Sequence, residues 1–359
     1  MEQRKHYIDN IRWITVSIVV IYHIIYIFNC SGVISNINVQ GIAILDTFLI
    51  FVYPWFMNLL FVIAGMSSRY SLSKRTNKEF IKDRAKRILI PSIVGIFVYG
   101  WINGYITNQY TDMFGNQMDL IPGGIKYLIK YLIFCMMGIG PLWFCHVLFL
   151  GSVLLVFVRK IDKNEKLLEL GSKIKVWMLI PLFFVVWGSS NILNMPLIEV
   201  YRFGIYLLMF LVGYYIFSNE KIMEKLEKYS IYLMLLTCIV GVIYVIKYYG
   251  KNYTDSNILK NAITNAYSWL AIISILSFGK KYLNFNNKIS SYMTKNNFSI
   301  YALHYMVVVI LGYLTVTYLN LPFIFNYLII LVGTIIILPI LIEVVRRIPI
   351  LNKLILGVK

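Results

Sequence analysis

Long apolar runs alternate with short polar segments along almost the whole chain. A helix needs about 20 mostly apolar residues to cross the hydrocarbon core of a bilayer. Runs of this kind predict ten membrane spans, at Ile11–Phe28, Ile44–Ser67, Ile88–Ile106, Leu142–Val158, Val176–Ile192, Phe203–Phe217, Ile231–Ile246, Ile263–Phe278, Phe298–Tyr318 and Phe323–Val345. The run Tyr127–Met137 is too short to span and is expected to be an interfacial or re-entrant helix. The predicted fold class is all-α, a polytopic transmembrane helical bundle of about ten spans.

Basic residues gather in alternate connections between these spans. Most Lys and Arg residues lie at the N-terminus, in the connections 69–87, 159–175, 221–228 and 280–295, and at the C-terminus. The intervening connections hold few, among them Lys126, Lys130, Lys247, Lys251 and Lys260. Because cytoplasmic loops carry the excess of Lys and Arg, both termini are predicted to be cytoplasmic, which requires an even number of spans.

Composition supports one membrane domain over residues 1–359 rather than a soluble protein. The residues are 59% hydrophobic and 14% charged, whereas soluble domains carry about 25% charged residues. The net charge of +18 resides in short loops, where it indicates topology and contacts with anionic membrane lipid rather than nucleic acid. The four cysteines are scattered without metal-ligand spacing, so no metal site is expected. The predicted location is the cell membrane, as a multi-pass protein of a bacterial plasma membrane.

The first predicted span carries three ionisable residues, Asp9, Arg12 and His23. Such residues are costly in a membrane and are usually functional. Arg12 and His23 are eleven residues apart, which is about 20° beyond three full helical turns, so they share a helix face roughly 16 Å apart along the axis. Asp9 lies one turn before Arg12 and can pair with it. Two structural alternatives stay open: an interfacial anchor at Asp9 and Arg12, and a histidine that packs against a neighbouring span.

Other polar residues near the predicted spans are weaker candidates. Arg84 and Arg87 lie one turn apart before the third span and could bind phosphate, although ordinary positive-inside charge explains most of that segment. Trp143, His146 and His304 are candidate substrate contacts. An aromatic belt explains Trp143 equally well, and a satisfied interior polar residue is the simpler interpretation of either histidine.

Five segments together resemble the acyltransferase 3 family of membrane acyltransferases. The first span matches the family's pattern of Asp, then Arg, then ten residues, then His, and the later segments follow in the family's order over nearly the whole chain. The matching segments are YIDNIRWITVSIVVIYH, LLFVIAGMSSRYSL, FIKDRAKRILIP, GPLWFCHVLFL and FSIYALHYMVV. The chain departs from the family at Ala64-Gly65, where Ser-Gly is common.

The resemblance implies transfer of an acyl group, most often acetyl, from cytoplasmic acyl-CoA to a hydroxyl of a cell-surface glycan or lipid-linked sugar. His23 matches the family's catalytic histidine and Arg12 its partner, while Arg84 and Arg87 match the basic motif proposed to hold the phosphates of CoA. On this hypothesis His23 is a general base. Whether the protein forms a homo-oligomer or works with a partner enzyme stays open. The rival hypothesis is a transporter or flippase of a polar or lipid-linked substrate, in which the same Arg and His line a path.

Overall fold

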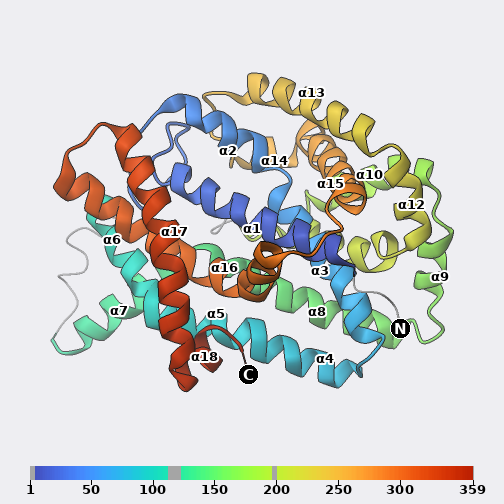
Figure 1. Cartoon of the computed structure of the whole chain (residues 1–359), viewed down its shortest axis with the longest axis horizontal. Helices are drawn as coiled ribbons and strands as arrows, with labels where there is room; N and C mark the ends of the chain where they lie inside the picture. Colours follow the sequence, from blue (N-terminus) through green and yellow to red (C-terminus); the bar gives the residue numbers. More distant parts are fainter. Residues whose placement is uncertain (1–4, 112–122, 196–199, 359) are drawn as a thin grey trace. The chain divides into compact units, whose positions relative to one another are not determined.

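The computed structural model describes residues 5–111, 123–195 and 200–358, and these residues are mostly helical (Figure 1). The α-helices are α1 (His6–Tyr26), α2 (Asp46–Val52), α3 (Phe56–Leu72), α4 (Asn77–Arg84), α5 (Ile90–Gly95), α6 (Trp101–Thr111), α7 (Ile125–Met137), α8 (Trp143–Ile161), α9 (Lys166–Lys173), α10 (Leu179–Ser189), α11 (Phe203–Val212), α12 (Glu220–Lys228), α13 (Ser230–Tyr248), α14 (Ser256–Lys260), α15 (Ala262–Tyr282), α16 (Lys288–Leu314), α17 (Phe323–Arg347) and α18 (Pro349–Ile355). The π-helical turns are Ala85–Leu89, Ile96–Gly100, Gly213–Phe217 and Thr315–Leu319, and the 3-10 turns are Ala43–Leu45, Gly140–Leu142 and Val176–Met178. Within the described ranges, β-structure is limited to an isolated bridge between Asn194 and Arg202. The all-α prediction is confirmed.

The predicted spans correspond to long helices or to bent pairs of helices. Among the described residues, eight helical stretches are long and apolar enough to cross a membrane, or up to ten if each of two bent pairs is one span. The bent pairs are Lys166–Lys173 with Val176–Ser189, at 109°, and Phe203–Phe217 with Glu220–Lys228, at 89°. α9 and α12, the charged arms of these pairs, are amphipathic. The prediction of ten spans matches the upper number, which counts each bent pair as one span, and the cytoplasmic placement of the termini stays a prediction.

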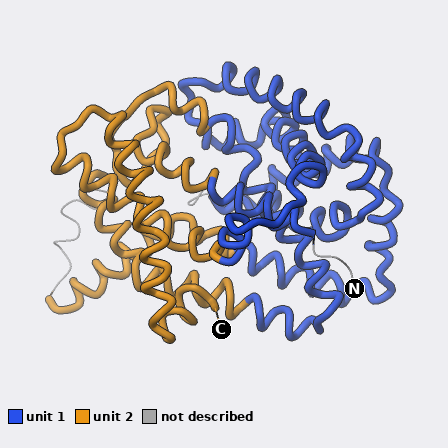
Figure 2. The backbone as a smooth tube through the Cα atoms, viewed as in Figure 1, with its two compact units in different colours: residues 1–17, 50–84, 147–295 blue, residues 18–49, 85–146, 296–359 orange. Residues whose placement is uncertain are grey.

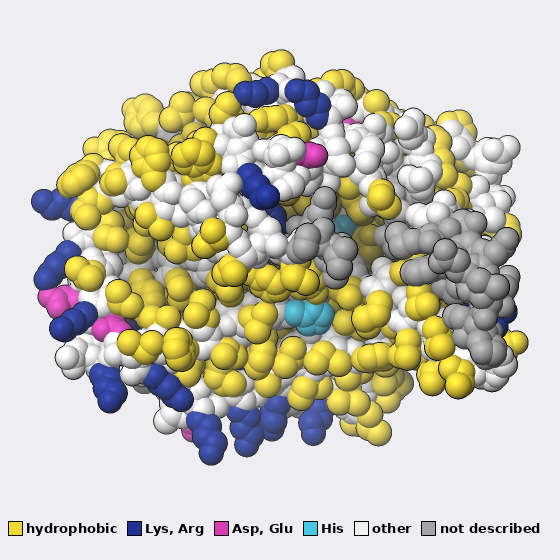
Figure 3. All heavy atoms as spheres, turned by 180° about the vertical axis from the view of Figure 1, so that it is seen from behind, with side chains coloured by type: hydrophobic (Ala, Val, Ile, Leu, Met, Phe, Trp, Pro, Cys, Tyr) yellow, Lys and Arg dark blue, Asp and Glu magenta, His cyan; other side chains and the backbone are white. Residues whose placement is uncertain are grey.

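The surface has the character expected of a protein in lipid. Figure 3 shows a face on which hydrophobic side chains predominate and basic side chains gather at the edges. Two long helices, α13 and α17, bury only 22% and 28% of their most apolar windows inside the protein. Apolar side chains exposed over such lengths are stable where lipid covers them.

The chain divides into two compact units, each made of segments that are distant in sequence (Figure 2). Unit 1 comprises residues 1–17, 50–84 and 147–295, and unit 2 comprises residues 18–49, 85–146 and 296–359. Each boundary between them falls inside a helix or a run of helical turns, so α1, α2, α8 and α16 contribute residues to both units.

In unit 1, α3 packs closely against α11 because glycines stand at the contact. A Cβ added to Gly65 would lie 2.0 Å from the carbonyl oxygen of Phe210, and one added to Gly213 would lie 2.0 Å from that of Val62. Helices in lipid associate largely through such close packing, since lipid tails are as apolar as the side chains they replace. Gly65 belongs to the Ala64-Gly65 pair at which the sequence departs from the family that it resembles, and that departure leaves the closely packed glycine in place.

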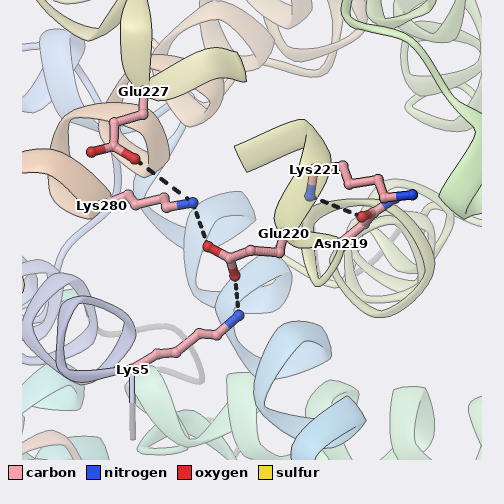
Figure 4. A network of polar contacts seen from close by, with 6 residues as sticks. All are labelled: Lys5, Asn219, Glu220, Lys221, Glu227 and Lys280. Carbon is pink, nitrogen blue, oxygen red and sulfur yellow. Dashed lines mark hydrogen bonds and ion pairs between the residues drawn. The ribbon is translucent and has the colours of Figure 1, made fainter. Parts of the chain in front are cut away.

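A charged network in unit 1 ties the start of α1 to α12 and α15 (Figure 4). Glu220 accepts hydrogen bonds from the ammonium groups of both Lys5 and Lys280, and Lys280 also lies 3.7 Å from a carboxylate oxygen of Glu227. Burial alone would raise the pKa of Glu220, but the hydrogen bonds from Lys280 and Lys5 outweigh it and lower that pKa below its ordinary value of 4.5. The network therefore stabilises the folded protein while Glu220 is ionised.

Unit 2 is built around an apolar core and a close pair of helices. Its buried cluster is Ile24, Ile27, Phe28, Ile37, Ile106, Tyr305, Val308, Val309, Tyr327 and Ile330. The short helix α7 packs on α6 through glycines, since a Cβ at Gly104 would lie 1.9 Å from the carbonyl oxygen of Phe134. The predicted short helix at Tyr127–Met137 is thus present as α7, and its position relative to the membrane stays a prediction.

Candidate active site

His23 and His304 meet in unit 2, although the sequence offered them as separate candidates. His23 lies on α1 and His304 on α16, and Nδ1 of His23 is 3.1 Å from Nε2 of His304. His304 is fully buried, with 0% of its surface exposed, whereas His23 is only partly buried. One ring is therefore enclosed by protein while the other can be reached from outside the core.

Each imidazole is also held by backbone carbonyls of its own helix. Nδ1 of His23 lies 2.9 Å from the carbonyl oxygen of Val19, one turn earlier. Nδ1 of His304 lies 2.8 Å from the carbonyl oxygen of Tyr301 and 3.2 Å from that of Ile300. These contacts fix the orientation of both rings.

Tyrosine side chains enclose the ring of His23. The rings of Tyr22, Tyr26 and Tyr305 meet it edge-to-face, with centroids 5.2, 6.0 and 4.6 Å away. The hydroxyl of Tyr305 donates to the side chain of Asn36, which fixes that ring in turn. These residues were not among the candidates predicted from the sequence. Tyr22 and Tyr26 could have been noticed because they flank His23 on the same helix, whereas only the fold brings in Tyr305 and Asn36.

A chain of hydrogen bonds continues from Asn36 to α6. Its amide nitrogen donates to the hydroxyl of Thr107 at 2.6 Å, and that hydroxyl donates to the backbone carbonyl of Asn103 at 2.8 Å. The side-chain oxygen of Asn103 is buried and has no hydrogen-bond partner among the described residues. Polar side chains therefore continue from the histidine pair through Tyr305 and Asn36 to α6, which suits chemistry on a polar substrate.

In unit 1, two arginines converge on adjacent serines of α3. Arg12 donates to Asp9 at 3.2 Å, as their spacing predicted, and also to the hydroxyl of Ser67. Arg84 donates to the hydroxyl of Ser68 at 3.1 Å. Neither serine was among the candidates predicted from the sequence. Arg12 was the one indication of these serines in the sequence, because an arginine within a membrane span requires polar partners on a neighbouring helix.

The remaining candidates lie elsewhere in unit 2. Arg87 is exposed on the π-helical turn that begins directly after Arg84, and the boundary between the two units falls between these arginines. Trp143 and His146 lie one turn apart at the start of α8. Phe144, between them, packs its ring 5.4 Å from Tyr301, the residue whose carbonyl holds His304. A joint phosphate site of Arg84 and Arg87, and a joint role of Arg12 and His23, stay predictions.

A polar cavity of about 310 Å³ opens in unit 1 at the start of α1 and α16. It is lined by His6, Asp9, Asn10, Asn286, Ser290, Ser291, Thr294 and Lys295. Its volume is at the lower end of ligand pockets, roughly 300–1,000 Å³. Its lining combines hydroxyl and amide groups with the cation of Lys295 and the carboxylate of Asp9, which suits a polar ligand rich in oxygen. Within the described ranges no group of three His, Cys, Asp or Glu side chains could hold a metal ion.

A family described as acyltransferase domain, acyltransferase 3, matches residues 5–343, which include both histidines and both serine-bound arginines. The chain belongs to the acyltransferase 3 family. This membership supports a membrane acyltransferase, and it confirms the resemblance drawn from the five sequence segments.

Named relatives of this acyltransferase 3 protein are distant. It is 24% identical over 375 residues to glucans biosynthesis protein C of Escherichia coli strain SMS-3-5 / SECEC, with 99% of this chain and 95% of the relative covered. The same protein of Escherichia coli strain K12 is 23% identical, with the same coverage. No solved structure matches the chain.

Proposed function

We propose that this acyltransferase 3 protein transfers an acyl group, with acetyl as the first candidate, from cytoplasmic acyl-CoA to a hydroxyl of a glycan or lipid-linked sugar in the cell membrane. The observation that carries the proposal is the contact between His23 and His304. A partly accessible imidazole, held rigidly against a buried one, suits a general base near neutral pH. Family membership supports acyl transfer as the reaction class.

In the proposed step, His23 accepts the proton of the acceptor hydroxyl while the hydroxyl oxygen attacks the carbonyl carbon of the thioester. The new C–O bond forms, the C–S bond breaks, and the proton passes from the imidazolium to the leaving sulfur. The products are an O-acyl ester and free CoA, so the reaction requires no covalent acyl-histidine.

Basic residues of unit 1 and of the 84–87 segment support an anionic donor. The guanidinium groups of Arg12 and Arg84 are both held on α3 by serine hydroxyls, which leaves each oriented before a ligand arrives. We assign the CoA phosphates to Arg84 and Arg87, since guanidinium groups match phosphate oxygens well. The cavity that contains Lys295 offers a second place for the charged end of the donor.

For the acceptor, the names of the relatives favour a sugar polymer. Both are glucans biosynthesis proteins, and glucose polymers present many hydroxyls. Trp143 and His146 are the proposed sugar contacts, because aromatic rings stack on sugar faces and imidazoles bind hydroxyls. His304 is fully buried, so a supporting role suits it better than contact with a sugar.

The test uses the purified full-length protein in detergent, with radiolabelled acetyl-CoA and a glucan acceptor. We expect label in the glucan and release of CoA, with transfer dependent on both substrates. CoA is best separated chromatographically, because the four cysteines of the chain are unpaired and would react with thiol reagents. A transporter or flippase would neither release CoA nor transfer label, and that result would contradict the proposed function.

A further inference from the structure

The hydrogen-bond partners of His304 determine which of its nitrogens carries a proton. Its Nδ1 faces the carbonyl oxygens of Tyr301 and Ile300, at 2.8 and 3.2 Å. Carbonyl oxygens only accept hydrogen bonds, so Nδ1 must be the donor. A neutral imidazole has one donor and one acceptor nitrogen. Nε2 of His304 therefore presents a lone pair.

The same reasoning carries over to His23. Its Nδ1 faces that lone pair at 3.1 Å and the carbonyl oxygen of Val19 at 2.9 Å. Both neighbours are acceptors, so Nδ1 of His23 carries a proton that the two share. Two adjacent cationic rings would repel each other, and charging the fully buried His304 would be costly, so the resting pair is neutral. The lone pair of His23 is then on Nε2, the nitrogen that points away from His304.

We propose that His304 is a positioning residue that fixes the tautomer of His23, so that Nε2 of His23 is the atom that receives the proton of the acceptor hydroxyl. The identity of that hydroxyl rests on the proposed function, whereas the tautomer does not. When His23 becomes cationic, its Nδ1–H bond to His304 becomes charge-assisted and stronger. His304 thereby stabilises the protonated form without itself taking the proton, a role that a carboxylate plays in hydrolytic triads.

The tyrosines around His23 help to determine which of its nitrogens faces His304, because they restrict rotation of the ring. Edge-to-face contacts with Tyr22, Tyr26 and Tyr305 leave the ring little freedom to exchange its two nitrogens. Tyr305 is itself held by Asn36. The orientation of Nε2 is therefore set before a substrate binds, which reduces the cost of reaching a reactive geometry.

The kinetic test compares His304→Phe, which removes the acceptor at similar volume, with His304→Gln, whose side-chain oxygen can still accept from His23. For His304→Phe we expect kcat to fall about 10- to 100-fold, as when outer partners of functional histidines are removed. KM for acetyl-CoA should stay within about twofold of the wild-type value, because His304 is not among the residues proposed to bind the donor phosphates. His304→Gln should recover most of kcat. Full activity in His304→Phe, or equal loss in both variants, would overturn the inference while the wild type remained an active transferase.

A second measurement does not depend on activity. The chain has four histidines, so selective nitrogen-15 labelling of histidine gives few signals, and each can be assigned with a single-residue variant. At neutral pH we expect Nδ1 of His23 to be protonated and Nε2 unprotonated in the wild type, and this preference to weaken in His304→Phe, which leaves only the carbonyl of Val19 to accept from Nδ1. A wild-type His23 protonated at Nε2 would overturn the inference. If the wild type transfers no acyl group, the proposed function fails and the nitrogen-15 result alone decides the inference.

Discussion

Nδ1 of His23 lies 3.1 Å from Nε2 of His304, although 281 residues separate them in the sequence. The contact joins the first long helix to the ninth predicted span. It converts two isolated histidines, each with a simple structural explanation, into a pair with defined donor and acceptor atoms. The proposed chemistry depends on this pair, while the proposed donor binding depends on the arginines and the cavity.

Arg84 is expected to contribute to binding of the donor rather than to chemistry. Arg84→Ala should raise KM for acetyl-CoA about 5- to 30-fold, with a smaller change in kcat, because a charge-assisted contact contributes roughly 1–2 kcal/mol. Ser68→Ala should raise KM more weakly, since it removes only the hydroxyl that holds Arg84. Steady-state kinetics with varied acetyl-CoA measure both effects.

The control for that experiment is Lys82→Ala, because Lys82 is exposed on the same helix. If Lys82→Ala raised KM as much as Arg84→Ala, general positive charge would explain the effect. The specific assignment of phosphate to Arg84 would then be wrong.

Lys295 is expected to bind the charged end of the donor in the cavity at the start of α16. Lys295→Ala should weaken CoA-dependent thermal stabilisation, because ligand binding to the folded state raises the melting temperature with occupancy. Lys288→Ala is the matched control, as Lys288 is exposed on the same helix and does not line the cavity. Equal stabilisation of both variants by CoA would exclude the cavity as a donor site.

Gly65 is expected to be required for the packing of α3 on α11. Gly65→Ala places a Cβ 2.0 Å from the carbonyl oxygen of Phe210, and backbone atoms must move to relieve that clash. Overpacking of this kind costs typically about 1–3 kcal/mol. Gly188→Ala is the control, since a Cβ there meets nothing within 4 Å. Thermal melts in detergent should show a lower melting temperature for Gly65→Ala alone, and equal melting of the two variants would contradict the close packing.

Glu220 is expected to make stability depend on pH. Burial alone would raise the pKa of Glu220, but Lys280 and Lys5 lower it in the folded protein. The ionised Glu220 therefore stabilises the fold at pH values above the pKa of the unfolded state, near 4.5. This stabilisation is lost as pH falls through the lower pKa of the folded state. Glu220→Gln should reduce stability by about 1 kcal/mol or less near neutral pH, and the difference from wild type should shrink below pH 4.5. Thermal melts between neutral and acidic pH measure this difference. Glu224→Gln, on the same helix and exposed, should show no such trend, and a constant difference for Glu220→Gln would rule out the ionised network.

Much of the fold follows from the sequence because bilayer thickness sets the length of an apolar helix. All ten predicted spans are helical, and the short Tyr127–Met137 run forms α7. The bends of 109° and 89° could not be predicted, since only a break of a few residues separates α9 from the helical segment after it and α12 from the helical segment before it. Their direction depends on packing with neighbouring helices rather than on local composition.

Of the contacts in the site, only those between residues of the same helix could be predicted from the sequence. Helical periodicity related Asp9 to Arg12, because both lie on α1 one turn apart. It could not pair His23 with His304, since contacts between distant segments leave no trace in the periodicity of either. The serines Ser67 and Ser68 were missed for the same reason, although an arginine near a membrane span indicated that polar partners must exist.

The most direct test of the account compares acetyl transfer to glucan by wild type, His23→Ala and Ile21→Ala under one set of conditions. Ile21 is 40% exposed on the same helix and serves as the matched control. If His23 is the general base, kcat should fall about 100- to 10,000-fold in His23→Ala, while Ile21→Ala retains wild-type activity. A His23→Ala protein that is folded and transfers acetyl at the wild-type rate would contradict the account.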